Sequence, residues 1–295
     1  MNKRVIFALV CTLWMSIMHS GECAEPAPFI ERKPNGSINW TQGIVQAVGI
    51  GKPDETGSAK PLDAGVTALY HARTNAKLNL IKILKGIRID SKRNVAAVAG
   101  QNYSILAKIN EIAFETPENE KLRKHLPDGT VEVRVQLALY GGFSQLVLPP
   151  EIQQIESIKP MRSKNKANIQ QAGKVSAPEI FTGLVIDARG TGVEPSLVPC
   201  LLDENGHEVF GAAFVSREFA VQSGMCGYSS DIKASINSER VGPNPLVVKG
   251  LRPAEPGSSD IIISNTDAAK LLSSSEHLLF LKKCRVLIVL DSPVK

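Results

Sequence analysis

The amino-acid sequence predicts an α+β protein of two domains, and three observations lead to this prediction. The chain has 295 residues, a length that favours two domains at about 100–200 residues per domain. Its first half combines strand-like alternation with long amphipathic helical patterns, whereas its second half holds mainly short aliphatic runs. Between them, residues 143–179 are polar and lysine-rich with little apolar periodicity, so they are predicted to be a linker.

Composition and charge exclude several classes of protein. Hydrophobic residues make up 43% of the chain and its net charge is +5, which is typical of a globular protein and not of a disordered one. The positive charge is small and dispersed, without the basic stripe of a nucleic-acid-binding protein. Aromatic residues make up only 5% of the chain, which disfavours stacking platforms for single strands. We therefore expect no nucleic-acid partner.

Residues 1–24 have the layout of a secretory signal peptide. A short basic start precedes an apolar run at residues 5–18, and small or polar residues follow it. The run is shorter than the roughly 20 residues that cross a bilayer. We therefore expect cleavage and export, and the alternative is an uncleaved anchor. Lipidation of Cys23 needs a small residue before it, but Glu22 stands there, so anchoring in the outer membrane through Cys23 is not expected.

The first domain is predicted at residues 39–142, after an extended lead-in at 25–38. A strand at 43–50 is closed by a Gly-Lys-Pro turn, because glycine and proline punctuate elements. Apolar residues then recur every three or four positions, which predicts a long amphipathic helix ending near Gly86. These apolar residues are Leu62, Val66, Leu69, Ala72, Ala76, Leu80 and Leu84.

The rest of the first domain completes a two-layer arrangement. A short strand at 87–89 and a second helical pattern at 95–109 come next. Residues 131–139 alternate strictly between apolar and polar, as in an antiparallel strand with one face on the core and one in water. A turn at Asp128-Gly129 makes residues 112–115 the predicted hairpin partner. The domain is thus predicted to be a mostly antiparallel sheet with two helices packed on one face.

The second domain is predicted at residues 180–295 as a mixed α/β domain. Continuous aliphatic runs at 184–186, 246–248, 261–263 and 286–290 are typical of strands buried on both faces. Strands at 197–202 and 208–214 flank a hairpin loop that contains an Asn-Gly pair. Helices are predicted at 216–222 and at 266–273, the second capped by Asn265 or Thr266.

Three cysteines remain after the leader, namely Cys200, Cys226 and Cys284. In an oxidising envelope two of them can pair in a disulfide, and the alternative is three buried, inert thiols. Cys226 lies in a glycine-flanked loop that would let a substrate approach a thiolate, but no histidine is near it in the sequence. A loop position or a disulfide is favoured over a catalytic role.

Motifs that carry catalysis or metal binding are not found in the sequence. The histidines and cysteines lack the spacing of a local zinc site, and no GxSxG elbow occurs. We therefore expect no catalytic residue, cofactor or metal. Asp187 and Arg189 follow a predicted strand, where Arg189 can contact an anionic ligand; a local ion pair is the commoner arrangement.

Three segments of the first domain carry a resemblance to a known family. They are residues 43–49 (GIVQAVG), 68–73 (ALYHAR) and 84–91 (LKGIRIDS). This order of strand, closing glycine and Ala-Arg helix resembles the bacterial envelope family of flagellar outer-membrane lipoprotein P and the N-terminal domain of flagellar assembly protein T. The resemblance covers residues 40–140. Residues 182–190 and 244–249 look like the companion domain of two-domain members.

The resemblance implies a periplasmic, non-catalytic structural or assembly protein, with copies of itself or a flagellar or secretion machine as partners, close to the outer membrane or peptidoglycan. The chain departs from the lipoprotein members because it lacks their lipobox before Cys23. Two alternatives remain open. One is a ligand- or peptidoglycan-binding module, and the other is an enzyme that uses Cys226 or residues assembled only in space.

Overall fold

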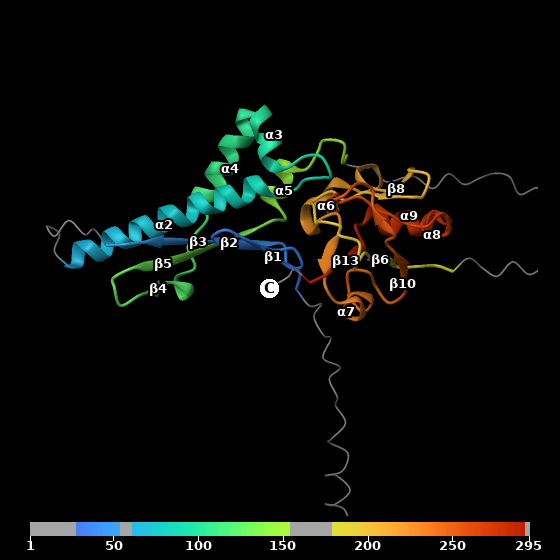
Figure 1. Cartoon of the computed structure of the whole chain (residues 1–295). Helices are drawn as coiled ribbons and strands as arrows, with labels where there is room; N and C mark the ends of the chain where they lie inside the picture. Colours follow the sequence, from blue (N-terminus) through green and yellow to red (C-terminus); the bar gives the residue numbers. More distant parts are fainter. Residues whose placement is uncertain (1–27, 54–60, 154–178, 293–295) are drawn as a thin grey trace, which may run out of the picture.

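The computed structural model describes residues 28–53, 61–153 and 179–292 (Figure 1). The predicted fold class is confirmed, because an antiparallel sheet with helices forms the first half and sheets with parallel pairing form the second. Figure 1 shows the two halves side by side along the long axis of the molecule. The predicted leader at 1–24 lies outside the described residues.

The first domain is built on a five-stranded antiparallel sheet in the order β1-β2-β3-β5-β4. Its strands are β1 (Ile30–Lys33), β2 (Gly36–Asn39), β3 (Ile44–Gly51), β4 (Lys124–His125) and β5 (Val131–Ala138). The predicted strands at 43–50 and 131–139 are confirmed as β3 and β5, which pair along their whole length. The lead-in prediction is wrong for the described part of residues 25–38. They form the β1–β2 hairpin, whose turn has Asn35 at a φ of 62°.

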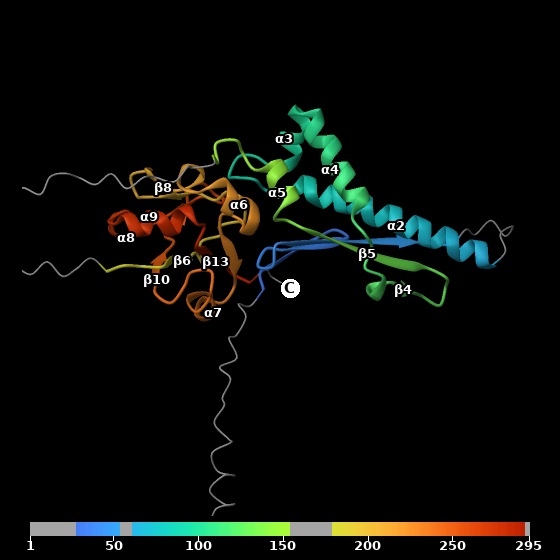
Figure 2. The ribbon, with the colours of Figure 1, turned by 180° about the vertical axis from the view of Figure 1, so that it is seen from behind.

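The long predicted helix is α2 (Pro61–Gly86), and it lies along the sheet in both ribbon views (Figures 1 and 2). Small residues allow the two backbones to approach closely. A Cβ at Gly49 would lie 2.1 Å from the carbonyl oxygen of Ala72, and one at Gly51 would lie 1.9 Å from that of Ala68. Only glycine fits such an approach. The glycines and alanines of the resemblance motif therefore have a packing role in this chain.

The second helical pattern is split in two. Asn102 ends α3 (Val95–Gln101), and its side chain caps α4 (Tyr103–Glu115). Helix α4 packs against α2, on the helical side of the sheet. The predicted hairpin partner at 112–115 is wrong, since these residues are the last turn of α4 and β5 pairs with β3 and β4. The predicted strand at 87–89 is reduced to one bridge between Arg88 and Asn94.

The linker prediction is wrong for residues 143–153. This segment contains α5 (Gly142–Val147), and it buries Phe143, Val147, Leu148 and Ile152. These apolar residues are spaced unevenly around a short helix and two prolines, so they give no regular period in the sequence. The lysine-rich residues 159–174 lie outside the described residues.

The second domain holds two four-stranded sheets, and the predicted α/β character is confirmed. The parallel sheet has the order β10-β6-β13-β9, and the mixed sheet has the order β11-β12-β7-β8. Their strands are β6 (Gly183–Asp187), β7 (Leu201–Leu202), β8 (Glu208–Phe210), β9 (Gly227–Ser229), β10 (Pro245–Lys249), β11 (Arg252–Pro253), β12 (Ile261–Ile262) and β13 (Val286–Val289). The predicted strands at 197–202 and 208–214 are longer than β7 and β8.

Helices surround these sheets. They are α6 (Arg217–Ser223), α7 (Ile232–Ile236), α8 (Asn265–Leu271) and α9 (Ser275–Lys282). Helix α8 is capped by the Ser264 side chain, one residue before the predicted cap. Helices α7 and α9 were not predicted. Buried His277 is bound by the N–H of Phe181 at 3.2 Å, so a polar residue occupies the core side of α9 and breaks its apolar pattern.

One hydrophobic core runs through both domains. Tyr140 stands between them, because a Cβ at Gly43 or at Gly224 would lie 2.3 or 2.5 Å from its ring. Trp40 meets Tyr228 edge to face at 5.5 Å. The N–H of Val198 donates to the carbonyl of Ile89 at 2.7 Å. The two domains therefore pack as one unit.

Candidate functional site

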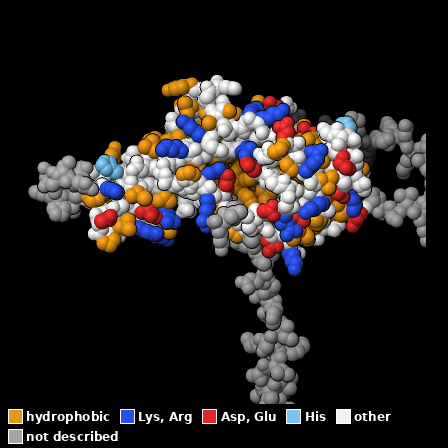
Figure 3. Space-filling model, viewed as in Figure 1, with side chains coloured by type: hydrophobic (Ala, Val, Ile, Leu, Met, Phe, Trp, Pro, Cys, Tyr) orange, Lys and Arg blue, Asp and Glu red, His pale blue; other side chains and the backbone are white. Residues whose placement is uncertain are grey.

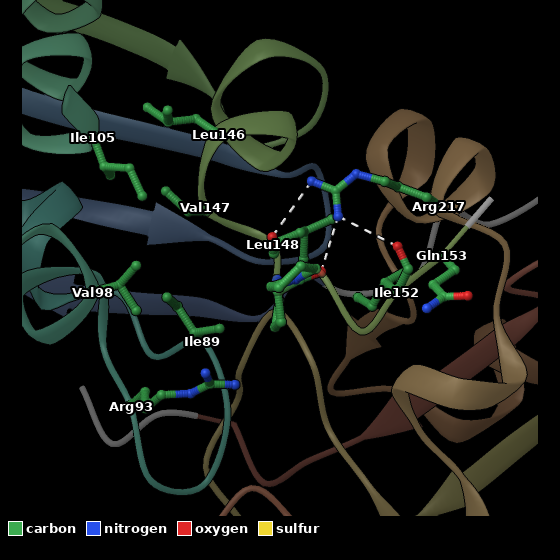
Figure 4. Close-up of a pocket in the computed structure, with 12 residues that line it drawn as sticks. Ile89, Arg93, Val98, Ile105, Leu146, Val147, Leu148, Ile152, Gln153 and Arg217 are labelled. Atoms are coloured by element: carbon green, nitrogen blue, oxygen red, sulfur yellow. Dashed lines mark hydrogen bonds between the residues drawn. The ribbon is translucent and has the colours of Figure 1, made fainter. Parts of the chain in front are cut away.

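An arginine of the second domain forms hydrogen bonds with the C-terminal segment of the first domain (Figure 4). Arg217, at the start of α6, donates to the carbonyl oxygen of Pro149 at 2.9 Å, a bond drawn in Figure 4. It also donates to the carbonyl oxygen of Gln145 at 3.0 Å. Longer bonds of 3.4 Å reach the carbonyls of Leu148 and Ile152. These carbonyls belong to the C-terminal end of α5 and the turn after it, where a cation is favoured by the helix dipole. Arg217 therefore joins the two domains through backbone atoms.

Beside Arg217 lies an apolar pocket at the domain junction, with a volume of about 500 Å³. That volume lies within the usual range for small-molecule sites. Figure 4 shows aliphatic side chains from α3, α4 and the α5 segment gathered on one side, with Arg217 on the other. The lining residues are Ile89, Arg93, Val98, Ile105, Leu146, Val147, Leu148, Pro149, Pro150, Ile152, Gln153 and Arg217.

A smaller, polar hollow of about 170 Å³ adjoins this pocket and shares Arg93 with it. It lies on the loop between α2 and α3, and its lining residues are Gly86, Arg88, Asp90, Ser91, Lys92, Arg93 and Asn94. Asp90 organises the loop, because its carboxylate accepts from the N–H of Arg93 at 2.8 Å and from the guanidinium Nε at 2.8 Å. The loop thus presents basic side chains next to an aliphatic cavity.

The far end of the first domain carries a second surface feature, the end of strand β3, which extends beyond its neighbour β2. Strand β2 pairs with β3 only as far as Ala47, while β3 continues to Gly51. Two amides of α2 cover the outward carbonyls instead. The Nδ2 atoms of Asn79 and Asn75 donate to the carbonyls of Val48 and Ile50, each at 2.8 Å. Helix α2 therefore provides hydrogen bonds in the place of a neighbouring strand.

An apolar patch, made of Ile50, Val66 and Tyr70, surrounds this end of β3. The three side chains are 52%, 64% and 66% exposed. Val66 and Tyr70 are four residues apart on α2 and share a helix face, and Tyr70 and Ile50 line an open hollow of about 560 Å³. Figure 3 shows hydrophobic side chains exposed at this left-hand end of the molecule. The patch is separate from the shared core.

The predicted ligand contact at Asp187 and Arg189 is a local ion pair in the structure. Arg189 Nε lies 2.7 Å from Asp187 Oδ1, and Lys249 Nζ lies 3.4 Å from Oδ2. The Arg189 guanidinium lowers the pKa of Asp187 to about 2. The pair lies at the carboxyl end of β6 and is engaged within the protein. The commoner arrangement considered from the sequence is thus the one found.

The three cysteines are free thiols, and the disulfide considered from the sequence is not formed. Burial raises the pKa of Cys226 to about 11 and that of Cys284 to about 12, and it also raises the pKa of Cys200. A thiol with a raised pKa is protonated at neutral pH and is a poor nucleophile. This arrangement favours inert thiols over a catalytic Cys226.

Within residues 28–53, 61–153 and 179–292, no cluster of three or more His, Cys, Asp or Glu side chains is placed to hold a metal ion. Over the same ranges, no helix is both long and apolar enough to cross a bilayer.

The sequence did not point to the junction pocket. Its walls come from the α2–α3 loop, two helices, the segment after β5 and α6, so neither spacing nor period joins them. A weak signal existed in the apolar residues of the predicted linker, since a solvated tether does not need Phe143, Val147 and Ile152.

A family model described as Treponema pallidum Tp0624, second domain, matches residues 183–292. The match begins at β6 and ends after β13, so the second domain of this chain is similar to that domain. No curated protein matches the chain.

Proposed function

We propose that this chain is an exported, non-enzymatic structural or assembly protein of the bacterial cell envelope, a component of a flagellar or related periplasmic ring. In this proposal the leader at 1–24 directs export. The first domain then supplies a surface through which copies of the chain associate.

The apolar patch of Ile50, Val66 and Tyr70 is the observation that carries the proposal. Most exposed apolar residues of a protein are scattered singly, and adjoining ones mark interaction surfaces. Tyr70 and Ile50 flank a hollow with basic Lys52 and His71 beside them, which gives a mixed apolar and polar surface like those of protein interfaces. Aromatic residues such as tyrosine are also enriched among the side chains that dominate binding energy.

Two further features support the proposal. The packing of Gly49 against the backbone of α2 supplies a physical reason for the strand–helix motif that resembles the flagellar family. The shared core and the Arg217 bonds also hold the patch in a fixed orientation relative to the second domain. A rigid two-domain unit with a patch at one end can associate in a regular geometry.

The solution mass of the mature protein tests association through the patch. We expect light scattering on a sizing column to give a narrow species several times the monomer mass. The double change Val66→Glu and Tyr70→Glu should reduce this species to monomer, because two charges would be buried at the contact. Leu279→Glu, at a 51% exposed leucine on α9, is the matched control and should leave the mass unchanged.

A monomeric wild-type protein at all concentrations would contradict association through the patch, as would equal dissociation by Leu279→Glu. Export is tested separately. The full chain should fractionate with periplasmic proteins, and a chain without residues 1–24 should stay in the cytoplasm. Cytoplasmic retention of the full chain would contradict the envelope assignment.

A further inference from the structure

The walls of the junction pocket select an aliphatic ligand. Among the described residues, no aromatic side chain lines the pocket, so a flat ring finds no ring there to stack on. Branched aliphatic side chains and prolines form most of the lining. The terminal nitrogens of Arg217 already donate to four backbone carbonyls. The guanidinium therefore needs no hydrogen bond from a ligand in the pocket. A ligand gains free energy here by burying hydrocarbon.

The adjoining loop between α2 and α3 carries more positive than negative charge. The polar hollow is lined by three cations, Arg88, Lys92 and Arg93. Two carboxylates balance part of this charge, since Arg93 pairs with Asp90 at 2.7 Å and Arg88 pairs with Glu194. The exposed ammonium of Lys92 has no ion-pair partner among the described residues. The hollow therefore carries a net positive charge and favours an anion.

Arg93 connects the two hollows, because it lines both. Figure 4 shows its guanidinium beside Ile89, at the edge of the aliphatic side chains. An occupant of both hollows needs an apolar chain at one end and a negative group at the other.

We propose that the domain junction binds an anionic amphiphile. Its aliphatic chain lies against Val98, Ile105 and Leu146, and its carboxylate or phosphate lies at the loop of Lys92 and Arg93. This inference is independent of the proposed assembly function, because the pocket and the apolar patch share no residue.

Fluorescence of cis-parinaric acid tests the proposal on the full mature protein. We expect saturable binding of one fatty acid per chain. Its methyl ester should bind more weakly, because the ester has lost the negative charge. Competition with lysophosphatidylglycerol, lysophosphatidylcholine and free oleate separates the sources of the negative group: a phosphate-bearing lipid or a free fatty acid.

Two variants locate the site. Val98→Trp places a larger side chain in the lining of the apolar pocket. It should abolish binding of both acid and ester, with circular dichroism confirming the fold. Lys92→Glu changes an exposed side chain, so the fold is kept. It should weaken binding of the acid by about fivefold, the upper size of one exposed charge contact, and leave the ester unchanged. Lys121→Glu, at an exposed lysine outside both hollows, is the matched control.

Loss of acid binding in Val98→Trp together with selective weakening in Lys92→Glu would support the proposal. Three results would overturn it: no saturable binding to the wild type, equal effects of Lys92→Glu and Lys121→Glu, or full binding by a folded Val98→Trp variant. A monomeric protein that binds the fatty acid would remove the assembly proposal and keep this one.

Discussion

Strands β5 and β6 illustrate two ways of building a sheet in one chain. Along β5 the residues on the helix side are buried and their neighbours are partly exposed, so one face of the sheet packs on α2 and the other is open. Along β6 four consecutive residues are buried, because elements cover both faces. The first domain therefore keeps a sheet face free for contacts. The parallel sheet of the second domain is covered on both faces at β6, and its edge strand β10 exposes an apolar side chain, Val247.

The largest expected effects come from buried charges placed in these two strands. Val133→Asp should cost about 4 kcal/mol or more and unfold the first domain, because an uncompensated carboxylate would lie in the core. Arg134→Asp should cost only about 1 kcal/mol, since Arg134 lies on the open face of the sheet and the change removes a partly buried pair with Glu132. In β6, Val185→Asp and Ile186→Asp should both be as costly as Val133→Asp, because both residues are fully buried.

Urea unfolding followed by circular dichroism measures these four costs. Equal costs for Val133→Asp and Arg134→Asp would contradict the one-faced first sheet. A mild Val185→Asp or Ile186→Asp would contradict the two-faced second sheet.

A smaller effect is expected where the first domain packs backbone on backbone. Gly49→Ala should destabilise the protein by about 3 kcal/mol, because its Cβ would meet the carbonyl of Ala72 and over-packing distorts both elements. Gly100→Ala makes the same chemical change in α3, where a Cβ meets no atom within 4 Å. It should stabilise the protein by about 0.5 kcal/mol through helix propensity. Thermal melts of both variants are the measurement, and a neutral Gly49→Ala would show that α2 can move away from β3.

The smallest effect concerns acid stability of the second domain. The lowered pKa of Asp187, about 2 against an ordinary value of 3.8, means that its ionised form is stabilised by folding. Its contribution is complete above the unfolded pKa and is lost as the pH falls from about 4 to about 2. Asp187→Asn should therefore lower the unfolding free energy at pH 7 and reduce its fall over that acid range. An unchanged acid profile would show that the ion pair contributes nothing.

The contrast between the sheets also explains what the sequence could predict. Strict alternation at 131–139 identified β5, and continuous aliphatic runs identified β6 and β13, because burial determines both patterns. The run at 246–248 also located strand β10, but burial on both faces was wrong there, since Val247 of this edge strand is 43% exposed. The prediction of a hairpin partner at 112–115 was wrong because a run of three apolar residues, Ile112 to Phe114, fits a strand or the end of a helix equally well. Only the buried Ile109 and Ala113, on one face of α4, decide for the helix.

Tertiary features that leave no local pattern in the sequence could not be predicted from it. The role of Arg217 depends on carbonyls up to 72 residues away, and the junction pocket depends on several separate segments. The sequence left the arrangement of Asp187 and Arg189 undecided, because a spacing of two residues allows either an ion pair or an outward-facing arginine. Only the structure shows which arrangement is adopted.

The asparagines beside the end of β3 have a consequence for the proposed association of copies of this chain. Because the carbonyls of Val48 and Ile50 already accept from Asn79 and Asn75, a strand from another copy gains less by pairing there, and extension of the sheet as in amyloid-type stacking is disfavoured. In the association proposed above, contact at this end is therefore expected through side chains. Such side-chain contacts would set the geometry of the proposed assembly without joining the sheets of neighbouring copies.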